Sequence, residues 1–217
     1  MEMSSLKVLS IDIGITNLGY VYSQFNIDTQ FGSRYKANIY NENVELNLKS
    51  SKQDITIIDC NRVDITNVKH CRVPFHLCKL HHDRCIPDYL DHFIQETSYF
   101  EQADVILLER QPPVGITNVQ DLLFRLFRDK VKMISPSSVH KYFGMPSCDY
   151  DGRKRLSEEL SSSYLCNFTS FTNNIRRHDI ADAMLMTIYH YKTVKSELIN
   201  DYNATTPNEF EQFRFKG

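Results

Sequence analysis

Four acidic residues occupy positions from which they could bind a divalent cation together. Asp12 and Glu109 each stand at the end of an apolar, strand-like run. A carboxylate in that position is costly unless it is exposed, paired or bound to a metal. Asp179 and Asp182 are three residues apart, so on a helix they share one face. Two like charges on that face repel each other unless a cation neutralises them.

Two cations held by these four carboxylates could cleave a phosphodiester. A pair of ions roughly 3.5–4 Å apart activates a water and stabilises the leaving oxygen, and hard oxygen ligands favour Mg²⁺ or Mn²⁺ over zinc. Each residue alone also has a structural interpretation: a strand-end Asp is often a turn residue, Asp179 could cap a helix, and Glu109 could pair with Arg110. Their joint occurrence favours the metal site.

An α/β domain would bring these residues together. The apolar patterns predict five strands, over residues 6–13, 18–23, 53–60, 105–108 and 131–134. The first three can form an antiparallel meander, while the fourth needs a crossover and lies parallel to a neighbour. In this mixed sheet the ends of strands one and four can lie side by side.

Helical patterns flank the predicted strands. Helices are expected around 87–100, over 117–129, in a short turn after Pro136, over 152–165 and from Arg177 onward. Thr117 and Gln120 would form a capping box at the start of helix 117–129. That amphipathic helix is also a candidate dimer surface, although packing on the sheet would explain most of its apolar residues.

The predicted organisation is one domain with two insertions. The domain spans residues 1–196, and a polar tail follows over 197–217. Residues 25–51 are polar and rich in Asn, which indicates a loop insertion. Residues 70–86 form a second insertion, rich in Cys and His.

The second insertion has the residue types of a structural zinc site. Cys71-x6-Cys78-x2-His81-His82-x2-Cys85 offers thiols and imidazoles at tight spacing. The three cysteines with either histidine would form a Cys₃His set that staples a segment of little apolar content. The alternative is a surface loop with free thiols, because the spacing fits no single zinc-finger pattern.

The composition is that of a soluble globular protein. Of 217 residues, 41% are hydrophobic and 24% charged, and no apolar run is long enough to span a bilayer. The first residues lack the features of a signal peptide, so we expect an intracellular protein without membrane association and with reduced cysteines. The net charge of −2 does not by itself indicate a nucleic-acid partner.

Several segments of the chain resemble the RuvC-type Holliday junction resolvases of poxviruses and related large DNA viruses, which have an RNase H-like fold. The resemblance covers about residues 6–24 and 104–192. Its most specific pieces are Glu-Arg-Gln-Pro and Asp-x-x-Ala-Asp. The matching segments are Ser10–Asn17, Leu107–Pro112, Ile134–Pro136, Arg153–Arg155 and His178–Ala183.

The resemblance implies a homodimer that binds four-way DNA junctions and nicks two opposed strands. Recombination and replication intermediates would be its substrates, and each active site would hold two Mg²⁺ or Mn²⁺ ions. Junction shape, read by two sites at fixed separation, would supply selectivity. A viral protein of this kind would work where viral DNA is replicated in the host cell. The catalytic and metal-binding positions would be Asp12, Glu109, Asp179 and Asp182.

Basic residues near these segments are candidates for DNA binding. The resemblance implies that Arg153, Lys154 and Arg155 contact backbone phosphates, which gives salt-sensitive affinity. Arg176, Arg177 and Lys141 are further candidates. Without the resemblance, all six would be ordinary solvated helix residues. One departure from the family pattern is His178, which stands where a further acidic residue can occur and could titrate near neutrality.

Three other functions remain open from the sequence. Residues 12–17 also resemble the phosphate-binding hairpin of actin-like ATPases and sugar kinases, although such proteins need a second domain and Gly-rich loops, and this chain has seven glycines. An RNase H-like nuclease acting on RNA–DNA hybrids or transposon ends would share the carboxylates. A non-catalytic junction-binding module would tolerate Asp12→Asn, whereas a nuclease would not.

Overall fold

The predicted order of elements is confirmed by the computed structural model, which describes residues 4–27, 52, 54–67, 74–78, 84–113 and 117–205. In chain order the elements are β1 (Ser4–Asp12), β2 (Leu18–Ile27), β3 (Ile55–Val63), η3 (Phe75–Leu77), α2 (Ile86–Glu96), α3 (Tyr99–Gln102), β4 (Val105–Glu109), α4 (Asn118–Leu126), β5 (Val131–Ile134), α5 (Pro136–Tyr142), α6 (Tyr150–Leu165), α7 (Thr169–Thr172) and α8 (Arg177–Thr205).

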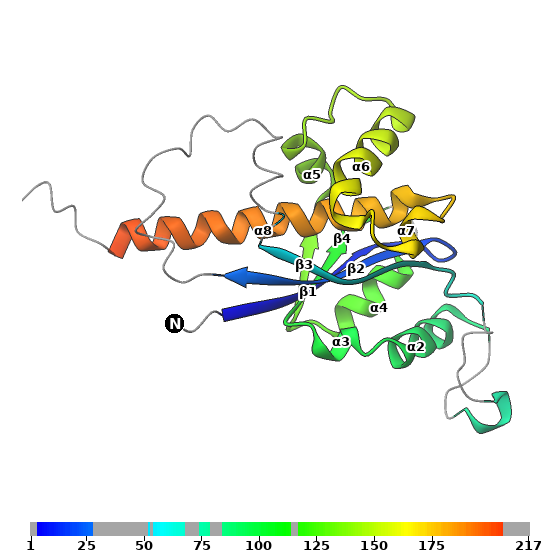
Figure 1. Ribbon diagram of the computed structural model, residues 1–217. Helices are drawn as coiled ribbons and strands as arrows, with labels where there is room; N and C mark the ends of the chain where they lie inside the picture. The colour runs from blue at the N-terminus through cyan, green and yellow to red at the C-terminus, as the bar shows by residue number, and fades with distance from the viewer. Residues whose placement is uncertain are drawn as a thin grey trace, which may run out of the picture.

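The five strands form one mixed sheet in the order β3-β2-β1-β4-β5. β1, β2 and β3 pair antiparallel, and β4 lies parallel to both β1 and β5. Helix α8 crosses one face of the sheet, and α2, α3 and α4 cover the other (Figure 1). The expected meander with added parallel strands is therefore confirmed.

The second strand is longer than its sequence pattern predicted. β2 continues to Ile27, inside the segment 25–51 that was expected to be a loop. Phe25 is fully buried and pairs with Ile55 of β3. Both core packing and backbone pairing with β3 therefore stabilise the strand at this residue. The prediction that the loop insertion begins at residue 25 was wrong. One buried aromatic residue among polar neighbours is too little apolar pattern to predict a strand. Most of the remaining segment lies outside the described residues.

Alternation along the central strands separates two hydrophobic cores. Val8 of β1 and Leu107 of β4 belong to the core on the α8 side, whereas Leu9 and Leu108 belong to the core beneath α2 and α4. Successive strand residues point to opposite faces. Residues an even number of positions from Val8 and Leu107 therefore face α8.

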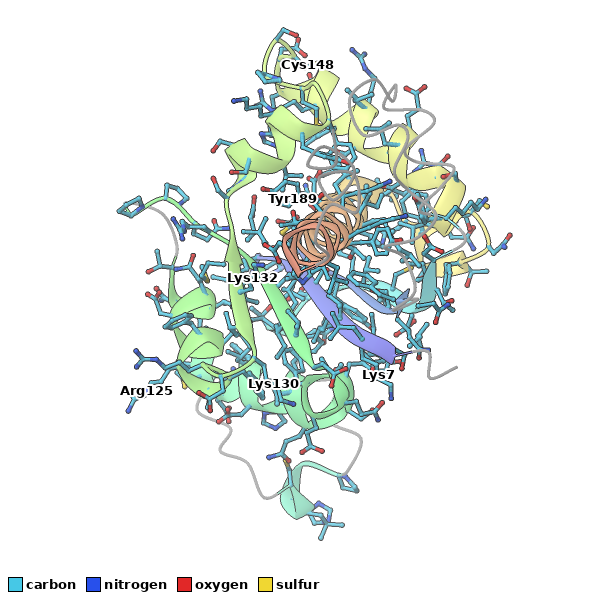
Figure 2. The ribbon with its side chains drawn as sticks, turned by 90° about the vertical axis from the view of Figure 1, so that its left-hand side faces the viewer. Lys7, Arg125, Lys130, Lys132, Cys148 and Tyr189 are labelled. Carbon is cyan, nitrogen blue, oxygen red and sulfur yellow. The ribbon has the colours of Figure 1, made fainter. Side chains whose placement is uncertain are left out.

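Helix α8 is held against the sheet by close contacts. The Ser10 hydroxyl hydrogen bonds to Thr187 Oγ1 at 2.7 Å inside the core, and the Thr187 hydroxyl donates to the carbonyl of Ala183. In the first turn of the helix, a Cβ on Gly19 would lie 2.1 Å from the carbonyl oxygen of Asp179. Only glycine permits this approach of helix backbone to strand. Figure 2 looks along α8 where it lies on the sheet.

Helix α8 continues beyond its expected end. It runs to Thr205, so the expectation of a polar tail from residue 197 was wrong over the helical part. Extending an existing helix adds one hydrogen bond per residue and avoids the cost of nucleation, so a polar segment can continue it. Within the described residues, no helix combines the length and the apolar character that crossing a membrane requires.

We predict that Gly19→Ala lowers stability, because the added methyl group meets helix backbone that cannot move aside cheaply. Overpacking of this kind typically costs about 1–3 kcal/mol. The measurement is urea unfolding at equilibrium, with the exposed α6 substitution Ser162→Ala as the control. An unfolding midpoint equal to that of the unmodified protein would show that α8 is not seated on β2 at this residue.

Candidate active site

The ends of two parallel strands place Asp12 beside Glu109. Ile11 pairs with Leu108 in the β1–β4 ladder, so the next residue of each strand is the acidic one. By the alternation that places Val8 and Leu107 on the α8 side, both carboxylates face α8. The two side chains lie close enough for the charge of Glu109 to act on Asp12.

The start of α8 brings the second acidic pair to the same place. Asp12 pairs with Gly19 across β1 and β2, and Gly19 contacts the backbone of Asp179. Asp179 is buried, and Asp182, one turn further on, is half-buried. The predicted convergence of four carboxylates from three elements is thus present in the structure.

Mutual repulsion and burial disturb the ionisation of this cluster. Burial first, and then the charges of Glu109 and Asp182, raise the pKa of Asp12 well above its ordinary value. Burial likewise raises the pKa of Asp182 to about 6, with Glu109 and Asp179 adding to the effect. Carboxylates held this close cannot all ionise cheaply without a compensating cation.

Neighbouring side chains partly compensate the negative charge of the acidic pair on α8. Arg176 binds Asp179 with two contacts, Nε to Oδ2 at 3.0 Å and Nη2 to Oδ1 at 3.3 Å. His178 Nε2 lies 3.2 Å from Asp179 Oδ1. Burial lowers the pKa of His178, while the neighbouring Asp179 carboxylate acts in the opposite direction. Ser157 of α6 hydrogen bonds to Asp182 and lowers its pKa.

Two hydrogen bonds made by Gln111 position the carboxylate of Glu109. The Gln111 side chain donates to Glu109 Oε2 at 2.8 Å, and the Gln111 backbone N–H donates to Gln120 Oε1 at 2.7 Å. Thr117 makes no side-chain cap hydrogen bond, so the predicted capping box was wrong: Gln120 serves the loop after β4 instead. Sequence reasoning missed Ser157, because a polar residue in a polar helix carries no pattern. It gave Gln111 no role, although that residue lies in the Glu-Arg-Gln-Pro segment.

The four carboxylates are close together but do not form a preorganised metal-binding site. Across the described residues, no three Asp, Glu, His or Cys side chains already surround a point where a metal ion would fit. Gln111 already binds Glu109, and Arg176 already binds Asp179, so a divalent cation would have to replace these partners. The donor set, all carboxylate oxygen, suits Mg²⁺ or Mn²⁺.

The predicted DNA-binding residues fall into two groups. Lys154 lies near Asp182 and 4.0 Å from the centre of the Tyr150 ring, and Arg155 and Lys141 are exposed. The others have protein partners: Arg177 pairs with Glu158 at 3.1 Å, Arg153 donates to the carbonyl of Cys148, and Arg176 holds Asp179.

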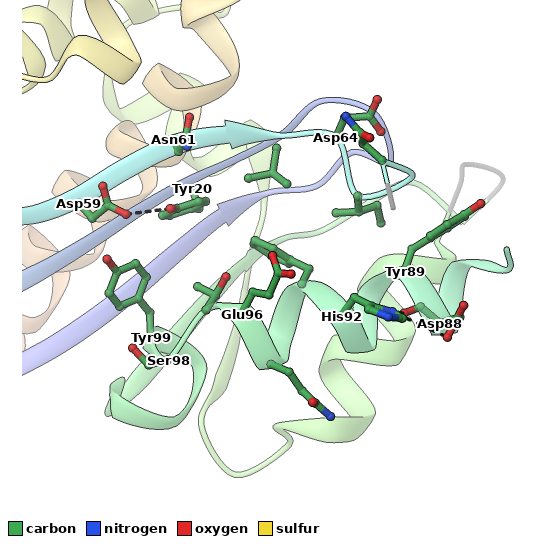
Figure 3. Close-up of a pocket in the computed structure, with 16 residues that line it drawn as sticks. Tyr20, Asp59, Asn61, Asp64, Asp88, Tyr89, His92, Glu96, Ser98 and Tyr99 are labelled. Atoms are coloured by element: carbon green, nitrogen blue, oxygen red, sulfur yellow. Dashed lines mark hydrogen bonds and ion pairs between the residues drawn. The ribbon is translucent and has the colours of Figure 1, made fainter. Parts of the chain in front are cut away.

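A hollow of about 430 Å³ lies on the other face of the sheet, between α2 and strands β2 and β3. Figure 3 shows Tyr20 bonded to Asp59 on one wall and Asp88 beside His92 on the other. None of the four clustered carboxylates lines this hollow. The carboxylate cluster is therefore separate from this hollow, on the α8 side of the sheet.

The expected zinc ligands are only partly visible. Cys78 and Cys85 are described, whereas Cys71, His81 and His82 lie outside the described residues. Cys78 Sγ lies 3.3 Å from Nε2 of His92, a residue of α2 that the sequence pattern did not include.

No model of a known protein family matches this chain, and no curated protein matches it. Solved structures do. The resolvase of Fowlpox virus, crystallised with Holliday junction DNA, aligns with a TM-score of 0.51 at 16% identity, over 87% of this chain and 99% of that chain. The yeast mitochondrial Holliday junction resolvase aligns with a TM-score of 0.55 at 14% identity, over 93% and 86%.

This chain shares its fold with these resolvases. The RNase H-like architecture expected from the sequence is confirmed. At such low identity the likeness concerns the fold, and the chemistry rests on the carboxylates described above.

We predict that Asp182→Asn stabilises the cation-free protein at alkaline pH. A carboxyl group whose pKa is raised by folding contributes stability below its unfolded value, near 4, and loses it as pH rises through about 6. Removing that group should therefore add roughly 1–3 kcal/mol above pH 7 and almost nothing at pH 4. Urea unfolding in chelator across this pH range measures the difference. A difference that does not change with pH would contradict the assigned repulsion.

Proposed function

We propose that this protein is a metal-dependent endonuclease that cleaves four-way DNA junctions. The observation that carries the proposal is the convergence of Asp12, Glu109, Asp179 and Asp182 at one rim of the sheet. The fold shared with two Holliday junction resolvases supports the choice of substrate. Cleavage of opposed strands also requires two sites at fixed separation, so we propose that the active form is a homodimer.

The four carboxylates would hold two Mg²⁺ or Mn²⁺ ions. When bound, the ions would activate a water and stabilise the leaving oxygen of the scissile phosphodiester. Asp12 and Glu109 are fixed by the sheet and by Gln111, so they supply a rigid half of the ligand set. Asp179 and Asp182 approach from α8, whose position depends on Gly19.

Positive groups around the rim would hold the DNA. Lys154 lies close enough to Asp182 to influence its pKa, so it can contact a phosphate at the reacting position. Exposed Arg155 and Lys141 can contact phosphates further away. Arg176 is engaged with Asp179, and a cation that takes over that carboxylate would release its guanidinium toward the DNA.

The substrate assignment predicts junction-selective nicking. The protein is incubated with a synthetic four-way junction, a linear duplex of the same sequence and an RNA–DNA hybrid, each with Mg²⁺ and with chelator. We expect symmetric nicks in the junction alone, and only with Mg²⁺. Cleavage of the hybrid but not of the junction would support a nuclease activity but contradict the proposed substrate. Junction binding without any cleavage would contradict the proposed nuclease activity.

The carboxylate assignment predicts separate effects on cleavage and binding. Asp12→Asn and Glu109→Gln should reduce junction cleavage by on the order of a thousandfold or more, because each removes a ligand needed in the transition state. Junction affinity in chelator should stay within a few fold. Glu159→Gln, an exposed carboxylate of α6, is the matched control and should cleave normally. Full activity of Asp12→Asn would contradict the site.

The basic rim predicts a salt effect. Each phosphate contact that is lost makes the dependence of log affinity on log salt shallower by about one. We therefore expect Arg155→Gln and Lys154→Gln to weaken junction binding and to flatten that slope. Lys7→Gln, five residues before Asp12 on β1, is the control. If the salt dependence of junction affinity were unchanged in both Arg155→Gln and Lys154→Gln, the DNA would bind at another surface.

A further inference from the structure

A second hollow, of about 200 Å³, lies at the outer edge of the sheet. Its walls come from the edge strand β5, from the start of α5 and from the middle of α8. Figure 2 shows Lys132 on β5 and Tyr189 on α8, and both residues line the hollow. Since one water takes about 30 Å³, the space admits a small ion together with several waters.

Two cationic side chains line this hollow without an opposing charge. Arg110 follows the last residue of β4, Lys132 lies on β5, and both are exposed. Within the described residues neither side chain forms a hydrogen bond or an ion pair, and no acidic residue lines the hollow. Three of the arginines predicted to bind DNA are, by contrast, already held by protein partners.

The strand ladder directs Lys132 toward α8. Lys132 pairs with Leu107 of β4, which belongs to the core on the α8 side, and paired residues of neighbouring strands point to the same face. A charged residue on the inner face of an edge strand can also protect that edge from pairing with another chain. Edge protection would require neither the second cation, Arg110, nor a hollow beside it.

Hydroxyl groups complete the polar lining. Ser135 and Ser138 contribute from the junction of β5 and α5, and Thr193 contributes from α8. Ser135 and Ser137 share a hydrogen bond of 2.8 Å, while the Thr193 hydroxyl donates to the carbonyl of Tyr189. Arginine, lysine and serine are the residues that commonly contact phosphate oxygens of nucleic acids.

A buried imidazole is an independent sign that a polar partner is missing. His190 lines the hollow and is only 3% exposed, and neither of its ring nitrogens has a hydrogen-bond partner in the part of the chain that the structure describes. Burial, and then the charge of Lys132, lower the pKa of His190 to about 4, so the ring is neutral and carries one N–H. Buried polar groups are normally hydrogen bonded. An anion in the hollow, or a water that it holds, would supply the acceptor.

We propose that Arg110, Lys132 and Ser138 bind one backbone phosphate of the DNA. The inference rests on the proposed function for the identity of the ligand. Arg110 directly follows Glu109, and its backbone N–H donates to the carbonyl of Ile134, so the hollow continues from the carboxylate cluster toward the edge of the sheet. The guanidinium can bind two phosphate oxygens, and the ammonium adds a point charge. A phosphate held here would fix the register of the strand that enters the cluster.

The first test is the salt dependence of junction binding, measured in chelator so that cleavage plays no part. Arg110→Gln and Lys132→Gln should each weaken junction affinity by roughly tenfold and make the slope of log affinity against log salt shallower by about one. Lys130→Gln is the matched control: it lies two residues before Lys132, and its ammonium donates to the carbonyl of Glu101 at 2.7 Å. Urea unfolding midpoints verify that all three variants remain folded. Unchanged affinity and slope in both variants would overturn the proposal.

The second test uses inorganic phosphate as the probe, without DNA. Isotope-labelled full-length protein is titrated with phosphate, and with sodium chloride at equal ionic strength. We expect saturable NMR shifts of the Ser138 amide and the His190 ring with phosphate alone, and their loss when Arg110→Gln and Lys132→Gln are combined. Such shifts together with unchanged junction slopes would assign the hollow to a free anion and overturn the DNA contact. If the unmodified protein bound no junction, the proposed function would fail, and the phosphate titration would still decide whether the hollow binds an anion.

Discussion

The close approach of the α8 backbone to Gly19 is the constraint on which the carboxylate rim depends. This rim is the edge of the sheet where Asp12, Glu109, Asp179 and Asp182 meet. Gly19 pairs with Asp12 across β1 and β2, so the helix that touches it also lies next to Asp12. Any side chain at this position would hold the helix away from the strand. The separation would be largest at the first turns of α8, which carry Asp179 and Asp182. One missing Cβ therefore decides whether two acidic pairs can share an ion.

The carboxylate rim is electrostatically unfavourable as the protein stands. Asp12 and Asp182 have raised pKa values because burial and neighbouring charges oppose their ionisation. The chain compensates this repulsion only in part, through the ion pair of Arg176 with Asp179. Stability is commonly sacrificed in this way at sites that bind ions or substrate. A divalent cation would remove the repulsion, which links the free energy of folding to the proposed chemistry.

The sequence by itself determined the succession of strands and helices along the chain, the antiparallel meander of the first three strands, and the acidic residues at strand ends and on the late helix, because alternation and helical spacing are local patterns. Acidic residues that end apolar runs were visible for the same reason. Only the tertiary structure decided what surrounds them: Gly19 beneath Asp179, Ser157 on Asp182, and His92 beside Cys78. These partners come from elements far apart in the chain, and each depends on how α8, α6 or the insertion packs. No local pattern encodes such packing, since burial and distance are set by the whole fold.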